Sequence, residues 1–180
     1  MKRLTLLRHA KSGDDGMVAR DFDRPLNAKG RRAARAVGRY MRDQALRFDA
    51  VIASPAARVV ETLQEVEAVY GSSLAPHWDK RLYLATADEL LDAVHGVPAD
   101  ATTILLVGHN PGLEQLVLRL VPPRTKGDAR GEVEIKYPTA SLAEMAFGVE
   151  RWDQVVDGGG ELVRFVRPRD LDPELGPDYA

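Results

Sequence analysis

Three short apolar runs, each followed by a polar turn and a segment of helical periodicity, constrain the fold of this chain more than any other feature. The runs are Leu4–Leu7, Asp49–Ser54 and Thr102–Val107. The third is apolar on both faces from Ile104 onward, which is typical of a central parallel strand. Strands that alternate with helices build parallel sheets. We therefore predict an α/β fold, and at 180 residues we expect a single domain, 1–180.

Capping residues mark where the helices between these runs begin. Asn27 is a suitable N-cap for a helix that we expect to run to about Leu46. Pro55 suits the first turn of the next helix. Thr86 and Glu89 have the spacing of a capping box, which predicts a third, shorter helix there.

The last third of the chain has the alternation and turn residues of further strands. We predict them over Glu132–Tyr137, Ser141–Phe147 and Glu161–Val166. The glycine run at Gly158–Gly160 is typical of a hairpin turn between the last two strands. The residues from Pro168 are rich in proline and aspartate. We expect a mobile C-terminal tail from about residue 170.

The composition narrows the classes of function. Lys and Arg number 25 against 27 Asp and Glu, so a net charge of −2 offers no broad basic surface for nucleic acid. The absence of cysteine excludes disulfides, thiolate metal ligands and a cysteine nucleophile. The apolar runs are too short to span a bilayer or to form a signal peptide. We expect a cytoplasmic protein with neither nucleic acid nor membrane as a partner.

Basic side chains follow all three apolar runs. Arg8 and His9 come directly after the first, Arg58 lies just beyond the second, and His109 closely follows the third. The C-terminal ends of parallel strands meet at one edge of a sheet, where α/β folds bind ligands. Guanidinium groups match phosphate oxygens, and the start of the helix that carries Arg58 adds free N–H groups. These residues indicate a site for a phosphoryl group.

Four motifs occur in a fixed order around these side chains. They are Leu7–Ser12, Asp21–Gly30, Ser54–Arg58 with Glu61 and Thr62, and Gly108–Gly112. In residue type, order and spacing they resemble the histidine phosphatase superfamily, and most closely its compact branch of SixA-type phosphohistidine phosphatases. The similarity extends over nearly the whole chain. It implies a three-layer α/β/α sandwich with a mostly parallel central sheet, like that of phosphoglycerate mutase.

The resemblance implies a covalent mechanism centred on His9. This side chain would attack phosphorus and become a phosphohistidine, which water then hydrolyses. A nucleophilic imidazole needs one unprotonated nitrogen, so a backbone carbonyl or similar acceptor should hold the other as N–H, and the candidates are Gly108 or a nearby carbonyl. The resemblance implies no metal and no cofactor.

The remaining site residues would bind the phosphoryl group. Arg8, Arg58 and His109 would hold its oxygens, and Arg24 matches an arginine that closes over the same group. Either Asp21 or His109 would protonate the leaving group. Taken singly, each of these residues also has an ordinary structural interpretation, as an ion-pair partner, a turn residue or a buried polar side chain.

Three functions are compatible with these residues. The first is a phosphatase acting on phosphohistidine of a protein, and the second is a phosphatase for a small phosphomonoester. The third, a non-catalytic phosphoprotein-binding module, does not explain why His9 is present. The mutase branch fits less well, because Ala10–Lys11 replaces the Gly and Glu or Gln that follow its Arg-His. Neither the physiological substrate nor the oligomeric state follows from the sequence.

Overall fold

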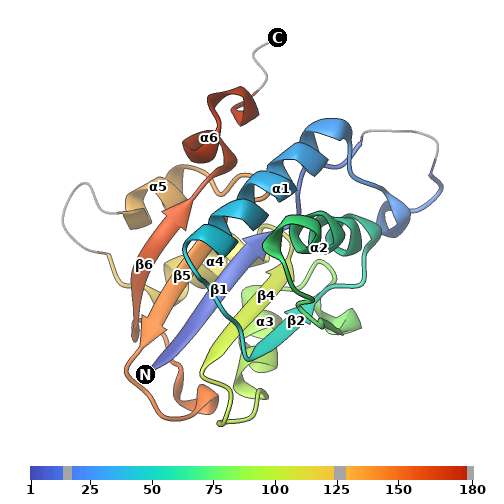
Figure 1. Cartoon of the computed structure of the whole chain (residues 1–180). Coiled ribbons are helices and arrows are strands. Elements are labelled where there is room, and N and C mark those ends of the chain that lie inside the picture. The colour runs from blue at the N-terminus through green and yellow to red at the C-terminus, as the bar shows by residue number, and fades with distance from the viewer. Residues whose placement is uncertain (14–17, 124–128, 178–180) are drawn as a thin grey trace.

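A six-stranded sheet forms the centre of the computed structural model, which describes residues 1–13, 18–123 and 129–177 (Figure 1). The strand order is β3-β2-β4-β1-β5-β6. The first four strands in this order are mutually parallel, whereas β5 and β6 run antiparallel to their neighbours. The strands are β1 (Lys2–Arg8), β2 (Ala50–Ala53), β3 (His77–Trp78), β4 (Thr103–Gly108), β5 (Leu142–Phe147) and β6 (Gly160–Val166).

Successive residues of the central strands face two separate apolar layers. In β4, Leu105 and Val107 pack with α1 (Ala28–Asp43) and α2 (Ala57–Tyr70). Ile104 and Leu106 pack with α3 (Ala87–His95) and α4 (Gly112–Leu120) on the opposite face. The chain therefore folds as the three-layer α/β/α sandwich that the sequence predicts, with a mostly parallel sheet and the phosphoglycerate mutase-like architecture.

The caps that the sequence predicts at Asn27 and Thr86 begin α1 and α3. The side chain of Asn27 accepts a hydrogen bond from the amide of Gly30, and Thr86 forms a capping box with Glu89. The first helix ends at Asp43, slightly before the predicted end at about Leu46. Short 3-10 segments complete the connections: η1 (Asp21–Asp23), η2 (Lys80–Leu82), η3 (Trp152–Gln154) and η4 (Pro173–Leu175).

One predicted strand is wrong, because residues 129–135 form the helix α5 (Ala129–Ile135). The alternation of charged and apolar residues from Glu132 to Tyr137 is compatible with a strand. In the structure only Val133 and Tyr137, four positions apart, are buried, while Ile135 is 84% exposed. A four-residue spacing is the helical period, and the exposed Ile135 produced the apparent alternation.

The chain after β6 continues into two short helical segments. These are α6 (Pro168–Leu171) and η4, which lie beside α1 (Figure 1). Leu175 is buried, and the ammonium of Lys29 donates to the carbonyl of Gly176 at 2.6 Å. The segment that the sequence predicts to be mobile from about residue 170 thus makes packing contacts as far as Gly176, and residues 178–180 lie outside the described ones.

A glycine at the start of α1 permits a close backbone approach beneath the site. A Cβ atom on Gly30 would lie 2.1 Å from the carbonyl oxygen of Lys11, which is too close for any side chain. This contact fixes the segment after β1 against α1. Among the described residues, no helix combines the length and apolar character needed to cross a membrane.

Candidate active site

The C-terminal ends of β1, β2 and β4 lie side by side and carry the basic residues that the sequence singles out (Figure 1). They border a cavity of about 390 Å³. Every predicted site residue lines this cavity: Arg8, His9, Asp21, Arg24, Arg58 and His109. The order of the parallel strands accounts for this convergence, because β4 lies between β1 and β2 and all three end at the same edge.

His9 is buried and fixed in one tautomer. Its Nδ1 lies 2.7 Å from the carbonyl oxygen of Ala10, which can only accept, so Nδ1 carries the proton. The accepting carbonyl is that of Ala10, whereas Gly108 accepts from the backbone amide of His9. Burial lowers the pKa of His9 to about 3, and the nearby His109 and Arg58 act in the same direction. At neutral pH the Nε2 lone pair is therefore free of a proton.

Arg58 connects this imidazole to the loop that carries Asp21. Its Nε donates a long hydrogen bond of 3.4 Å to Nε2 of His9. Its two terminal nitrogens bind the carbonyl and the carboxylate of Asp21 at 2.9 and 3.0 Å. The guanidinium is almost fully buried, so its orientation is set by these partners. The guanidinium of Arg58 is therefore already oriented to bind an anion beside His9.

Asp21 is held as a carboxylate by three neighbours. A hydrogen bond from Tyr83 and the guanidinium of Arg58 lower its pKa to about 2, with a further contribution from Arg24. Arg24 also forms an ion pair with the same carboxylate at 2.9 Å. At neutral pH, Asp21 has no proton to donate.

Arg8 and His109 complete the wall of the cavity. Arg8 donates to the carbonyl of Tyr137 at 2.9 Å, while its buried Nε has no hydrogen-bond partner among the described residues. The Nε2 of His109 lies 2.8 Å from the hydroxyl of Ser54, and its Nδ1 is buried and similarly unpartnered. Burial, with a contribution from Arg58, lowers the pKa of His109 to about 4. When the hydroxyl of Ser54 donates to Nε2, Nδ1 of the neutral His109 carries the proton, and this N–H and the Nε–H of Arg8 are then unpartnered buried donors available to a ligand.

Two supporting residues could not be found from the sequence motifs. Tyr83 donates to Asp21 at 2.6 Å, and its ring centroid lies 5.4 Å from that of His109. Tyr137 supplies the carbonyl that accepts from both Arg8 and Asn110. Neither tyrosine belongs to one of the four motifs. Tyr137 is the last residue of the strand that the sequence wrongly predicts, and Tyr83 lies between η2 and α3, so no motif connects either residue with the site.

The other histidines lie apart from the cavity. His77 is exposed on β3, and His95 of α3 hydrogen-bonds to the carbonyl of Val155 at 2.8 Å. Within the parts of the chain that the structure describes, no group of three potential metal-ligating side chains comes together.

Comparison with known proteins identifies the family of this chain. Residues 4–83 match the model of the histidine phosphatase superfamily (branch 1). A proposed phosphohistidine phosphatase SixA from Nakamurella multipartitia is 32% identical, with a TM-score of 0.79 over 93% of this chain and 96% of that one. The chain belongs to the histidine phosphatase superfamily. It is a SixA-like member and a phosphatase.

Two further relatives extend the comparison. A proposed SixA from Agrobacterium tumefaciens is 25% identical, with a TM-score of 0.77 over 93% of this chain and 98% of that one. An uncharacterized protein of Mycobacterium leprae is 31% identical, covering 91% of this chain and all of the relative. The likeness therefore extends well beyond the 4–83 match to the part of the chain that supplies His109.

Proposed function

We propose that this phosphatase hydrolyses phosphohistidine of a protein, without a metal ion, through a covalent intermediate on His9. The observation that carries the proposal is the tautomer of His9. Its Nδ1 proton is bound to the carbonyl of Ala10, and its Nε2 lone pair lies beside Arg58 in a cavity lined by three arginines. A neutral nucleophile among cations is suited to attack an anionic phosphoryl group.

The first step transfers the phosphoryl group to the enzyme. The Nε2 lone pair of His9 forms the new bond to phosphorus while the bond to the leaving nitrogen breaks. The substrate imidazole takes up a proton from solvent and leaves as the neutral ring. Arg8, Arg58 and the free Nδ1 of His109 face the cavity and would bind the phosphoryl oxygens. Water then attacks the phosphohistidine, which releases inorganic phosphate and restores neutral His9.

The protonation state of the candidate acids favours a nitrogen leaving group. Asp21, with a pKa of about 2, and His109, with a pKa of about 4, are both unprotonated at neutral pH. An alkoxide needs a strong general acid, whereas the imidazole of a phosphohistidine accepts a proton readily and leaves with less assistance. We therefore assign Asp21 to positioning Arg58 and propose no obligatory proton transfer from the protein.

The relatives support the same substrate class. Two of the similar structures are of proposed phosphohistidine phosphatases, and this chain covers both of them almost completely. An alkyl phosphomonoester as the substrate would require a proton donor, whereas in the structure Asp21 and His109 both have lowered pKa values. A binding module would require no neutral imidazole beside Arg58.

The test measures phosphate release from a phosphohistidine protein and from an aryl phosphate, in the presence of a chelator. We expect the parent enzyme to turn over the phosphohistidine protein, and His9→Ala to lose this activity by at least about a thousandfold. His77→Ala is a matched control, because it removes an exposed histidine outside the cavity and leaves activity unchanged.

Other outcomes would redirect the assignment. Turnover of the aryl phosphate alone would indicate a small-molecule phosphatase. Equal rates for the parent and His9→Ala would contradict the covalent mechanism. Binding of phosphoprotein without phosphate release from either substrate would favour the binding module.

A further inference from the structure

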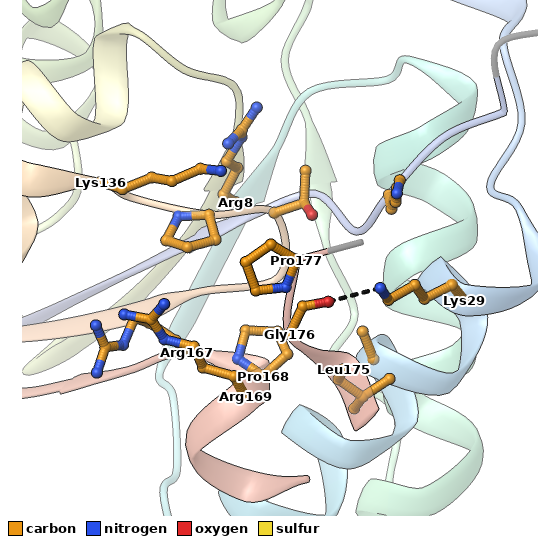
Figure 2. Close-up of a pocket in the computed structure, with 13 residues that line it drawn as sticks. Arg8, Lys29, Lys136, Arg167, Pro168, Arg169, Leu175, Gly176 and Pro177 are labelled. Atoms are coloured by element: carbon orange, nitrogen blue, oxygen red, sulfur yellow. Dashed lines mark hydrogen bonds between the residues drawn. The ribbon is translucent and has the colours of Figure 1, made fainter. Parts of the chain in front are cut away.

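A second cavity adjoins the catalytic one. It has a volume of about 300 Å³ and lies between the segment that precedes β5, the start of α1 and the C-terminal residues from Arg167 to Pro177 (Figure 2). Arg8, Lys11 and Thr139 line both cavities. We call this second cavity the annex. Because the two cavities share these residues, a molecule bound at His9 can extend into the annex.

Among the residues that the structure describes, the annex is lined by several cations and by no acidic side chain. Its basic residues are Arg8, Lys11, Lys29, Lys136, Arg167 and Arg169. Two of them are committed to internal contacts: Arg167 pairs with Asp170, and Lys29 donates to the carbonyl of Gly176. Lys136 and Arg169 are exposed, and their side chains have no ion-pair or hydrogen-bond partner among the described residues. These two charges are available to a bound molecule.

Apolar side chains line the rest of the annex. Pro138, Pro168, Leu175 and Pro177 lie among the basic residues, and Figure 2 shows Pro177 between Lys29 and the arginines. A site for inorganic phosphate alone would gain little from such a lining. The combination of cations with apolar surface suits an extended peptide segment that carries both acidic and apolar side chains.

We propose that the annex binds an acidic segment of the phosphoprotein next to its phosphohistidine, so that substrate selection depends on a flanking carboxylate. This inference rests on the proposed function, because it needs a protein substrate bound at His9. Lys136 and Arg169 would pair with the acidic side chains while Arg8 remains on the phosphoryl group. The preference should weaken as ionic strength rises, because exposed charges are screened within about 10 Å at 0.1 M salt.

The experiment compares two phosphohistidine peptides that differ only in carrying Glu or Gln at the flanking positions. We expect the parent enzyme to favour the Glu peptide in kcat/KM by roughly tenfold at low salt, as two partly exposed ion pairs would allow. Lys136→Gln/Arg169→Gln should abolish this preference and leave the rate on an aryl phosphate unchanged, since neither residue lines the catalytic cavity.

A charge-matched control separates the annex from general electrostatics. Arg39→Gln/Lys80→Gln removes one arginine and one lysine that are exposed and line neither cavity, so the preference should persist. If the parent hydrolyses both peptides equally well, or if the control loses the preference as fully as the annex variant, the inference is wrong while the proposed function stands.

Two further outcomes identify other failures. If no phosphohistidine peptide is hydrolysed, the proposed function fails, and the inference fails with it. If the parent favours a small bisphosphate over both peptides and the annex variant loses that preference, the annex binds a second phosphate rather than a protein segment.

Discussion

The hydroxyl of Tyr83 donates a hydrogen bond to Oδ2 of Asp21, 2.6 Å away, and Arg58 donates to the same oxygen from 3.0 Å. A carboxylate shared by a phenol and a guanidinium is stabilised in its charged form, and the pKa of Asp21 falls to about 2. This pair links the loop after β1 to the segment after η2. Because Asp21 stays a carboxylate and accepts from Arg58, it is better suited to orienting Arg58 than to donating a proton.

Asp21→Asn tests this assignment. We expect phosphohistidine turnover to stay within about fivefold of the parent value, because the neutral amide can still accept from Arg58. Inorganic phosphate should inhibit more strongly, since a negative charge beside its site is removed. Steady-state kinetics with phosphate as the inhibitor measure both effects. A loss of a hundredfold or more on the phosphohistidine substrate would restore Asp21 as the general acid.

Ser54→Ala is expected to disturb His109. The substitution leaves Nε2 of a buried imidazole without its partner at 2.8 Å. A buried polar group that loses its partner costs about 1–2 kcal/mol in the free energy of unfolding, and a reoriented His109 should slow turnover several-fold. Urea unfolding and kinetics measure the two effects. Ser72→Ala, at an exposed position, is the matched control, and an equal effect there would argue against the role of this contact.

The stability of the protein should fall as pH is lowered from 7 to 5. The pKa values of His9 and His109 are about 3 and 4 in the folded state, against about 6.5 in an unfolded chain. Between these values the unfolded state binds more protons, so acid favours unfolding. The stabilisation is complete above pH 6.5, and by pH 5 the loss is up to roughly 2 kcal/mol per buried histidine.

Urea unfolding at pH 7 and pH 5 checks this linkage. His9→Gln should show a smaller loss between the two pH values than the parent, because one of the two neutral histidines is gone. The lowered pKa of Asp21 affects the free energy of unfolding only as pH falls below about 3.8, so it does not contribute between pH 7 and pH 5. An identical pH dependence in both proteins would contradict the low pKa of His9.

Gly30→Ala should destabilise the protein although it lies in a helix. At an exposed position inside a helix, replacing glycine by alanine ordinarily raises the free energy of unfolding by about 1 kcal/mol. Here its Cβ would lie 2.1 Å from a backbone oxygen of Lys11, and overpacking of this kind costs about 1–3 kcal/mol. Thermal unfolding measures the loss. Gly148→Ala, with nothing within 4 Å of the new atom, should change stability by less than about 0.5 kcal/mol.

Sequence reasoning located the residues that follow buried parallel strands. Arg8, His9 and His109 follow the first and third apolar runs, and Arg58 lies in the first turn of the helix after the second run. Topology alone therefore predicts that these residues meet. Asn27 and Thr86 carried the capping signals that set the helices in place. These predictions succeeded because each depends on a short stretch of chain.

The sequence was less informative where distant segments meet. Tyr83 follows a single 3-10 turn, and the next residue, Leu84, has a φ of 51°, so no regular period predicts that it reaches Asp21. The strand expected over Glu132–Tyr137 failed because two buried residues in six do not distinguish a helix from a strand. The annex depends on the fold of the segment after β6, where proline and aspartate predicted only a mobile tail.

The position of β1 within the sheet has a consequence for how the enzyme loses activity. This strand pairs with β4 on one side and β5 on the other, and His9 is the residue after its end. A central strand leaves the native state only when the whole sheet opens. His9 should therefore keep its position until the sheet itself unfolds. We expect inactivation by heat or denaturant to coincide with cooperative unfolding of the entire domain.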